Sequence, residues 1–332
     1  MPKVLVTGAT GFIGSALVRA LVARGESVRA LVRPNSDLSR LDGLDVEIAR
    51  GDVLAPESLP PALAGVRVVY HLAGRLGQFG VPDEAYYRLH VEGTCNVLRA
   101  CAEPKGPAIE RLVYGSSPGM LGPLGPGDPP HKEDAPHRPT GAYEGSKSAA
   151  EQVALPLASE LGVPLVIARP EFVYGPGDTH VLGLFRAVQN GTFFYMGAGN
   201  GLCHPTYVDD AVQGLLACAS PRARPLEAYH LAGPRPVTIR AWATAIAAAL
   251  GARPPWLHVP VPLARAGAWG AEQAARLLGI HPPLTREGVR FFTASRAFSI
   301  EKAERELGWV PQVDVEEGTR RSVAWYREHG LL

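Results

Sequence analysis

The sequence predicts an α/β fold in which a doubly wound parallel sheet is followed by a smaller C-terminal lobe. Three observations predict it. Short apolar segments rich in β-branched residues alternate with amphipathic helical patterns, a glycine-rich turn follows the first of these segments, and the pattern changes after Arg169. Strands of a parallel sheet covered by helices are buried on both faces and are therefore continuously apolar, as these segments are.

Six apolar segments are predicted to form the strands of this sheet, because each is short and lies between helical patterns. They are residues 4–7, 28–32, 46–49, 66–71, 112–116 and 165–168. Three segments carry apolar residues at three- and four-residue spacing and are predicted to be helices that pack on the sheet. These are residues 15–24, 83–102 and 143–160.

The order of these patterns divides the chain into two predicted domains. Residues 1–170 form a dinucleotide-binding domain, and residues 171–332 form mainly a substrate-binding lobe. A later segment near residues 205–232 is expected to return to the first domain. Residues 119–139 are too rich in Pro and Gly for a helix or a central strand, so we expect a surface loop near the active site.

Composition excludes several classes of function. Lys and Arg number 33 against 32 Asp and Glu, so the chain has no overall field that would attract nucleic acid or an anionic membrane. No apolar run approaches the roughly 20 residues that span a bilayer, and the N-terminus lacks a signal-peptide pattern, so we expect a cytoplasmic protein. We expect no metal site, because the ten histidines show no metal-binding spacing.

Cysteine spacing points to structural residues. Cys95, Cys101, Cys203 and Cys218 show no CxxC pattern, and we expect them to be small core residues. Cys203 has the alternative of a reactive thiol that faces the substrate.

Three glycines form a predicted phosphate cradle. In KVLVTGATGFIGSALVRALVARG, Gly8, Gly11 and Gly14 lie between the first strand and the first helix. Glycines permit a tight turn and a close approach of the backbone to a pyrophosphate, which the free N–H groups of the helix N-terminus then bind. The alternative is a glycine turn that binds no ligand.

The end of the second strand distinguishes the two nicotinamide cofactors. A carboxylate there binds the ribose 2′-hydroxyl of NAD, but this chain has Val32 followed by Arg33, whose guanidinium suits a 2′-phosphate. We therefore favour NADP(H), with NAD(H) as the alternative and an ordinary surface arginine as the other interpretation of Arg33. Asp52, after the third strand, is either an adenine contact or a turn residue.

Tyr143 and Lys147 are four residues apart on a predicted helix, so they share one face and the ammonium can act on the phenol. Lowering a tyrosine pKa of about 10 by about 3 units takes roughly 4 kcal/mol of preferential phenolate stabilisation. Ser116 and Ser117 emerge at the carboxyl end of a strand, where ligands bind in such sheets. We choose Ser117 to hydrogen-bond a substrate oxygen, with Ser116 as the competitor. A solvated Tyr–Lys pair is the alternative.

These motifs together resemble the extended short-chain dehydrogenase/reductase family, also called the NAD-dependent epimerase/dehydratase family. The resemblance rests on TGATGFIG, HLAG at 71–74, the two serines, YEGSK, RPEFVYGPGD at 169–178, HPTYVDD at 204–210 and ELGWVPQVDVEEGTRRSVAWY near the C-terminus. It implies a Rossmann fold, Tyr143 as catalytic acid/base, Lys147 as its partner and Ser117 as the hydroxyl that orients the substrate oxygen.

The resemblance also implies further cofactor contacts and a homodimer. Its dimer is formed by two long helices per subunit, expected at residues 83–102 and 143–160. Besides the glycines, Arg33, Asp52, Tyr143 and Lys147, the cofactor-binding residues are expected to be Thr10, Phe12, Ile13, Val53, Leu72, Ala73, Gly74, Ser116, Pro170 and Val173.

Two positions depart from the family pattern. His90 stands where the family usually has an asparagine that organises a water and the lysine; it either replaces that asparagine by hydrogen bonding or is a satisfied core histidine. Phe172 stands where sugar-nucleotide members commonly have an asparagine that helps to hold the substrate diphosphate. The chain therefore looks closer to 3β-hydroxysteroid dehydrogenases and dihydroflavonol reductases, which act on apolar carbinols or ketones.

The sequence leaves three candidate functions. The first is an NAD(P)-dependent oxidoreductase that interconverts a secondary alcohol and a ketone. The second is a nucleotide-sugar epimerase or dehydratase with tightly bound NAD, and the third is a non-catalytic regulator that binds NADP. The small-molecule substrate is expected to lie among loops at residues 77–84, 121–139 and 185–203.

Overall fold

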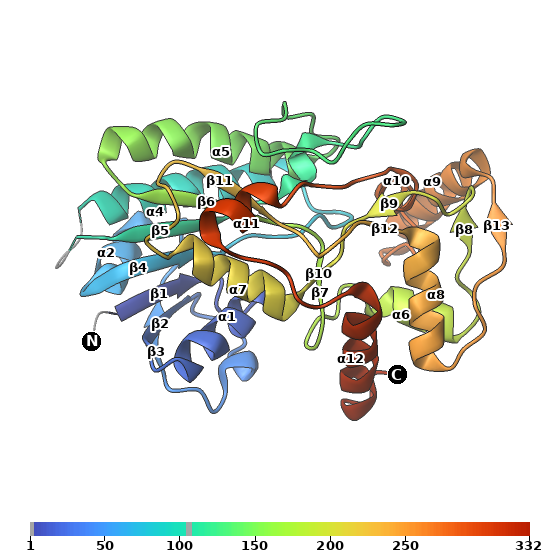
Figure 1. Ribbon diagram of the computed structural model, residues 1–332, viewed down its shortest axis with the longest axis horizontal. Coiled ribbons are helices and arrows are strands. Elements are labelled where there is room, and N and C mark those ends of the chain that lie inside the picture. Colours follow the sequence, from blue (N-terminus) through green and yellow to red (C-terminus); the bar gives the residue numbers. More distant parts are fainter. Residues whose placement is uncertain (1–2, 104–107) are drawn as a thin grey trace.

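The computed structural model describes residues 3–103 and 108–332 and contains a seven-stranded parallel sheet (Figure 1). Its strands lie in the order β11-β6-β5-β4-β1-β2-β3. The order reverses between β1 and β4, which is where open α/β sheets bind ligands. The strands are β1 (Lys3–Thr7), β2 (Ser27–Val32), β3 (Val46–Arg50), β4 (Val66–His71), β5 (Arg111–Gly115), β6 (Leu165–Pro170) and β11 (Ala228–Leu231).

Helices cover both faces of the sheet, and strand residues alternate between the two cores. Val4 and Val6 of β1 pack in the core beneath α1 (Phe12–Ala23) and α7 (Val208–Cys218). Leu5, which points the other way, packs beneath α4 (Gly93–Ala102) and α5 (Ala142–Leu161). This two-residue period explains why the strand sequences are continuously apolar.

A second group of helices forms a separate body at one end of the molecule (Figure 1). Its core contains Phe185, Trp242 and Tyr326, contributed by three helices. The helices are α6 (Leu182–Gln189), α8 (Ile239–Leu250), α9 (Val261–Leu278), α10 (Arg286–Thr293) and α12 (Val315–Glu328). Short strand pairs connect this body: β7 (Val173–Tyr174) with β10 (Thr206–Tyr207), β12 (Val237–Thr238) with β9 (Leu202–Cys203), and β13 (His258–Val259) with β8 (Tyr195–Met196).

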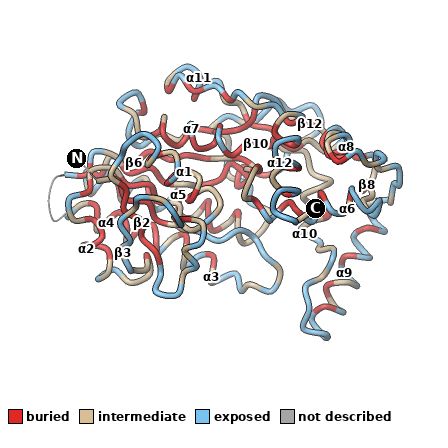
Figure 2. Tube along the Cα trace, turned by 90° about the horizontal axis from the view of Figure 1, so that it is seen from below, coloured by how far each residue is buried: buried red, intermediate tan, exposed pale blue. Residues whose placement is uncertain are grey.

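Short helices complete the chain. They are η1 (Ser39–Leu41), η2 (Pro56–Ser58), α2 (Leu59–Leu63), α3 (Asp83–Tyr87), the π-helical turn η3 (Arg88–Glu92), η4 (Pro118–Leu121) and α11 (Glu301–Leu307). Figure 2 shows buried residues concentrated along the sheet, whereas α9 extends away from the body and is largely exposed. Within residues 3–103 and 108–332, no helix is both long and apolar enough to cross a membrane.

The predicted fold class, six strands and three helices are confirmed, with ends that differ by a few residues. All four cysteines are buried, as predicted. Two loop predictions are wrong in part. Residues 119–139 do not lie wholly on the surface, because Met120 and Leu121 are fully buried against Phe298. Residues 185–203 begin inside helix α6, and Phe185 is fully buried.

Candidate active site

The glycine turn between β1 and α1 leaves no room for side chains. Gly8 has a φ of +70°, and a Cβ atom there would lie 2.6 Å from the carbonyl carbon of Leu72. A Cβ atom on Gly14 would lie 2.1 Å from the carbonyl oxygen of Gly8. Helix α1 begins after Gly11 with no side chain capping its free N–H groups. The turn therefore exposes backbone donors at a helix N-terminus, which is the geometry that binds a pyrophosphate.

Arginines gather at the end of β2. Val32 is buried, and the next residue, Arg33, is exposed. The Nη1 atom of Arg50 donates hydrogen bonds to the carbonyl oxygens of Arg33 and Pro34 at 3.2 and 2.9 Å. Arg40 donates from Nη2 to the carbonyl oxygen of Gly177 at 2.8 Å, beside the start of α1. Three arginines thus lie near the end of β2, together with the exposed carboxylate of Asp37, which interacts with Arg40.

Asp52 and Val53 follow β3 at the same edge. The Oδ1 atom of Asp52 accepts a hydrogen bond from the backbone N–H of Leu54 at 2.9 Å, which forms a turn. Val53 is buried. The geometry gives Asp52 a turn role, and its second oxygen has no hydrogen bond within the described residues.

Tyr143, Lys147 and Ser117 converge at the carboxyl end of β5. Helix α5 begins at Ala142, so Tyr143 and Lys147 lie one turn apart on its inner side. The Ser117 hydroxyl lies close enough to the Tyr143 phenol to lower its pKa. Lys147 Nζ donates to the carbonyl oxygen of Gly115 at 2.8 Å and lies 5.1 Å from the centre of the Tyr114 ring. Three polar groups therefore meet beside the predicted cofactor site.

Burial shifts the pKa values of both Tyr143 and Lys147. It raises the pKa of Tyr143 to about 12, although the nearby Ser117 hydroxyl acts in the opposite direction. It lowers the pKa of Lys147 to about 8, against the attraction of Glu151. Direct action of the ammonium on the phenol is not among the causes of the tyrosine shift. The expected lowering of the Tyr143 pKa is therefore absent from the protein alone.

The two serines differ in their contacts. Ser117 Oγ accepts a hydrogen bond from the Gly119 N–H at 3.3 Å and caps the short helix η4. Ser116 Oγ is buried and has no hydrogen-bond partner among the described residues. An unpaired buried hydroxyl is costly, so Ser116 is available to a ligand at this edge of the sheet.

A hydrogen-bond network joins β1 to the helix that follows β4. His71 lies between the hydroxyls of Thr7 and Thr94, at 2.8 and 3.2 Å. Because Thr94 donates its proton to the carbonyl oxygen of His90, His71 Nε2 must donate to Thr94. Thr7 in turn accepts from the Ala73 N–H at 3.1 Å. Burial lowers the pKa of His71 to about 3, so the ring is neutral.

His90 continues this network to helix α5. It lies in the π-helical turn η3, which interrupts the helical run between Asp83 and Ala102. Its Nε2 atom accepts from the Arg75 N–H at 3.1 Å, and its Nδ1 atom lies 2.8 Å from Ser146 Oγ. Ser146 donates its own proton to the Tyr143 carbonyl oxygen, so His90 Nδ1 must carry the proton that Ser146 accepts.

His90 is therefore a satisfied, neutral histidine, and burial lowers its pKa to about 2. A Cβ atom on Gly74 would lie 3.3 Å from His90 Nε2 and 3.6 Å from Lys147 Nζ. His90 thus holds the segment around Gly74 against the helix that carries Tyr143 and Lys147. Its ring bonds the Arg75 amide and Ser146 and makes no hydrogen bond to Lys147, which fits the alternative of a satisfied core histidine. Functional sites often contain such π-helical turns.

A buried ion pair fixes α5 to the sheet. Arg169, at the end of β6, donates from Nε and Nη2 to the two carboxylate oxygens of Glu151 at 3.0 and 2.6 Å. Both side chains are almost fully buried. Bidentate pairing fixes orientation as well as distance, so Glu151 and Lys147 keep their rotation relative to the strand ends.

Several charged residues beside the site were not predicted. Glu171 is buried after β6, and burial raises its pKa to about 7; its charge also acts on Tyr143. Glu144 pairs with Arg296 at 2.6 Å, close to Ser117. A small hollow between Gly77 and Tyr143 is lined by Glu287 and Arg290 of α10. Glu171 follows the recognised RP pair and Glu144 lies inside the YEGSK motif, whereas Glu287, Arg290 and Arg296 come from a distant part of the chain and no local signal marks them.

Phe172 belongs to an aromatic cluster. Its ring lies 5.2 Å from that of Trp242 and 4.8 Å from that of Phe291, and its φ of +33° is unusual for a residue other than glycine. A packed aromatic side chain therefore stands at the position where the family resemblance leads us to expect an asparagine in sugar-nucleotide members.

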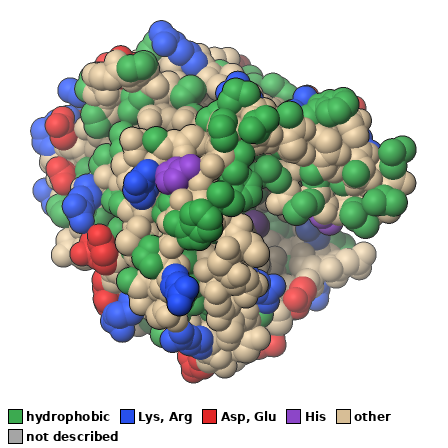
Figure 3. Space-filling model, turned by 90° about the vertical axis from the view of Figure 1, so that its right-hand side faces the viewer, with side chains coloured by type: hydrophobic (Ala, Val, Ile, Leu, Met, Phe, Trp, Pro, Cys, Tyr) green, Lys and Arg blue, Asp and Glu red, His purple; other side chains and the backbone are tan. Residues whose placement is uncertain are grey.

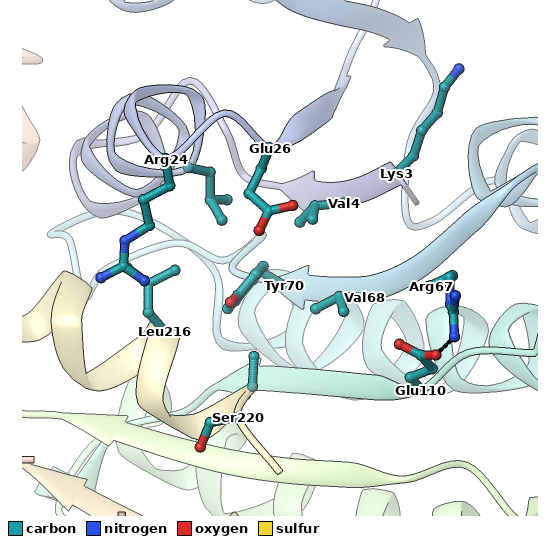
Figure 4. Close-up of a pocket in the computed structure, with 12 residues that line it drawn as sticks. Lys3, Val4, Arg24, Glu26, Arg67, Val68, Tyr70, Glu110, Leu216 and Ser220 are labelled. Carbon is teal, nitrogen blue, oxygen red and sulfur yellow. Dashed lines mark ion pairs between the residues drawn. The ribbon is translucent and has the colours of Figure 1, made fainter. Parts of the chain in front are cut away.

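A larger hollow, of about 260 Å³, lies at the opposite end of the strands from the predicted site (Figure 4). Lys3, Val68 and Tyr70 line it, together with the exposed ion pair between Arg67 and Glu110. It is at the amino ends of β1 and β4, whereas open α/β sheets bind ligands at the carboxyl ends. We therefore do not assign it to the active site.

The predicted site residues lie at or after the carboxyl ends of neighbouring strands and therefore lie along one end of the sheet. They follow β1 (Gly8, Thr10, Gly11, Phe12, Ile13, Gly14), β2 (Arg33), β3 (Asp52, Val53), β4 (Leu72, Ala73, Gly74) and β5 (Ser116, Ser117); Pro170 ends β6, Val173 begins β7, and Tyr143 and Lys147 lie on α5. The close backbone approach at Gly8 and Gly14, the free N–H groups at the start of α1 and the unpaired Ser116 hydroxyl fit a nicotinamide dinucleotide.

A family model described as "NAD dependent epimerase/dehydratase family" matches residues 4–232. A 2-alkyl-3-oxoalkanoate reductase from Stenotrophomonas maltophilia (strain K279a) is 34% identical over 335 residues, which cover 96% of this chain and 98% of the relative. A 4-hydroxy-2-methyl-3-oxo-4-farnesyl-3,4-dihydroquinoline-1-oxide ketoreductase from Stigmatella aurantiaca is 32% identical over 322 residues, covering 95% of this chain and 94% of the relative.

Solved structures show the same similarity over the full chain. The crystal structure of gox2253 has a TM-score of 0.84 and 32% identity, and the match covers 100% of both chains. MoeE5 in complex with UDP-glucuronic acid and NAD has a TM-score of 0.76 and 28% identity, covering 98% of this chain and 99% of the other.

Proposed function

This chain belongs to the NAD-dependent epimerase/dehydratase family, and we propose that it interconverts an apolar ketone and the corresponding secondary alcohol. The observation that carries the proposal is the placement of Ser117 directly after β5 and of Tyr143 and Lys147 one turn apart on α5, with Lys147 bonded to the last residue of β5, at the same end of the sheet as the glycine turn. Two hydroxyls at one point can hold a single carbonyl oxygen, and a dinucleotide in the turn brings its nicotinamide to the same edge.

In this proposal each side chain has one role. Ser117 donates a hydrogen bond to the substrate oxygen, and Tyr143 donates its phenolic proton as negative charge develops there. The nicotinamide dinucleotide, when bound, supplies the hydride in reduction and accepts it in oxidation. Gly8, Gly11 and Gly14 hold the pyrophosphate of this cofactor, and Lys147 holds the nicotinamide ribose while stabilising the phenolate by its charge.

The raised pKa of Tyr143 fits its role as the proton donor. A phenol with a pKa of about 12 is protonated throughout the neutral range, so it carries the proton that ketone reduction uses. Oxidation requires the phenolate, which Lys147 and the positive charge of the oxidised nicotinamide would have to stabilise.

The substrate class follows from the surroundings of the site. Phe172 and Phe291 are half-buried aromatic residues packed together, Phe172 also packs on the fully buried Trp242, and Phe172 leaves no amide for a diphosphate. The two relatives described above are reductases whose names specify an alkyl and a farnesyl group. We propose a ketone that carries a long hydrocarbon substituent.

We propose NADP(H) as the preferred cofactor, with Arg33 on the 2′-phosphate and Arg40 and Arg50 adding positive charge at the same edge. Titrating NADPH and NADH against the wild type and Arg33→Ala tests this. We expect tighter binding of NADPH and a selective loss of it in the variant, while Arg19→Ala, on the exposed side of α1, changes neither affinity. Equal affinities of the wild type for both cofactors would remove the basis for NADP(H).

The function itself is tested by supplying NADPH or NADH with a 2-alkyl ketone and following absorbance of the reduced nicotinamide. We expect net oxidation of the cofactor and formation of the secondary alcohol. The competing function is a nucleotide-sugar epimerase, as the likeness to MoeE5 permits. Purified protein that carries NAD and isomerises a UDP-sugar with no absorbance change would favour that function instead.

A further inference from the structure

Helix α9 has an unusual distribution of side chains. Its buried side carries small residues, Ala264, Ala268 and Ala275, together with Glu272. Large apolar side chains stand on the solvent side instead: Leu263, Trp269, Leu277 and Leu278 are 64%, 56%, 87% and 69% exposed. A surface helix of a globular protein normally shows the reverse arrangement.

The exposed apolar residues continue beyond the helix on both sides. Thirteen large hydrophobic residues of the described chain are exposed, and seven of them lie between residues 256 and 280, a segment that we call the α9 arm. The other three are Trp256, Leu257 and Ile280. Figure 2 shows the arm extending from the body, and Figure 3 shows hydrophobic side chains gathered at this end of the molecule. Such a concentration marks an interaction surface.

The residues of α9 form a continuous apolar stripe. At 100° per residue, Leu263 and Leu277 lie within about 40° of each other around the helix axis. Between them on the same side are Ala266, Gly267, Gly270 and Ala274, and glycines 267 and 270 contact nothing outside the helix. Trp269 lies at one border of the stripe, close to Arg265 and Arg276. The stripe therefore has an apolar centre and a basic border.

The exposed charge around the arm is positive. Arg253, Arg265 and Arg276 are exposed, and none takes part in an ion pair among the described residues. Glu272 is the single acidic residue between positions 251 and 283, and it is buried and paired with Arg286 at 2.8 Å. The arm thus differs from the whole chain, whose net charge of +1 gave no reason to expect a membrane partner.

We propose that the α9 arm docks on the surface of a bilayer that contains anionic lipids. An amphipathic helix with exposed leucines, tryptophan at the border and arginines beside it lies in the membrane interface with its apolar side inserted. A second copy of this chain suits the arm less well. A two-fold symmetric contact would bring the same arginines together without an exposed acidic residue to neutralise them.

The arm lies close to the small hollow beside Tyr143. The guanidinium of Arg276 lies 5.6 Å from the ring centre of Phe79, in the segment that lines the hollow beside Tyr143. Helix α10 follows the arm and contributes Glu287 and Arg290 to the same hollow. This placement would let the enzyme take up a hydrocarbon substrate directly from the bilayer, a consequence that rests on the proposed function.

Vesicle flotation of the full chain tests the docking without any turnover. We expect the wild type to float with vesicles of phosphatidylcholine and phosphatidylglycerol and to bind pure phosphatidylcholine at least tenfold more weakly. Because each arginine near an anionic surface contributes about fivefold to the partition coefficient, Arg253→Glu with Arg265→Glu should lower it at least about 25-fold. Leu277→Ser with Leu278→Ser should also release the protein.

Matched variants outside the arm give the controls. Arg19→Glu with Arg99→Glu changes the net charge equally, and Val310→Ser removes another exposed apolar side chain; both should float as the wild type does. Equal loss in these controls, or no flotation of the wild type, would overturn the proposal. So would a vesicle-free dimer, detected by light scattering, that the arm variants dissociate. NADPH binding by each variant verifies folding.

Discussion

Replacing Lys147 with methionine should make the cofactor-free protein more stable at neutral pH and less stable, relative to the wild type, at alkaline pH. Lys147 is buried, and burial lowers its pKa from 10.5 to about 8. The unfolded chain therefore binds more protons than the folded chain between these two values. The free energy of unfolding of the wild type must rise with pH across that window.

The size of the effect follows from the two pKa values. The lowered pKa reduces the free energy of unfolding by about 3 kcal/mol at pH 7 and by about 1 kcal/mol at pH 10, relative to a lysine that keeps its ordinary pKa. Lys147→Met removes this cost but also loses the hydrogen bond to Gly115 and the contact with the Tyr114 ring, together worth roughly 1–2 kcal/mol. The variant should therefore gain about 1–2 kcal/mol at pH 7 and lose up to about 1 kcal/mol at pH 10.

Urea denaturation of both proteins at pH 7 and pH 10 measures this difference. The informative quantity is the change in the stability difference between the two pH values, about 2–3 kcal/mol, because it isolates the titration of one group. A Lys147→Met variant whose stability relative to the wild type does not depend on pH would refute the reasoning. The variant should also have lost the reductase activity, so that stability and function change in opposite directions.

Other substitutions test the framework of the site. His90→Leu should lower the free energy of unfolding by about 2 kcal/mol, because Ser146 and the Arg75 amide lose a partner. His90→Asn should recover much of this loss, and equal urea midpoints for the two variants would contradict this expectation. Gly14→Ala should abolish dinucleotide binding in a fluorescence titration, since its Cβ would clash with the turn, while Gly183→Ala, in open space on α6, should bind normally. Ser117→Ala should lower kcat/KM by roughly tenfold or more, and an unchanged value would assign its role to Ser116.

Features set by nearby residues were predictable from the sequence. The glycine turn needs only the spacing of three glycines between a strand and a helix, and Tyr143 and Lys147 share a face because of the helical period. The strands of the sheet were recognisable because burial on both faces makes them continuously apolar.

Features set by long-range folding were not predictable. Arg296 is 152 residues from its partner Glu144, and Arg290 reaches the hollow beside Tyr143 from a helix near the C-terminus. The π-helical turn around His90 inserts one residue into a helix whose apolar spacing gives no sign of it. Helix α9 is a different case, because its apolar residues were visible but only the fold shows that they face solvent.

The central claim is that the Tyr143 phenol gives its proton to a substrate oxygen held by Ser117. It is tested most directly by single-turnover reduction of a ketone with saturating reduced cofactor, comparing the wild type with Tyr143→Phe. We expect the variant to bind the cofactor normally and to transfer hydride at least 100-fold more slowly, because only the acid is missing. Hydride transfer at the wild-type rate in Tyr143→Phe would contradict the claim.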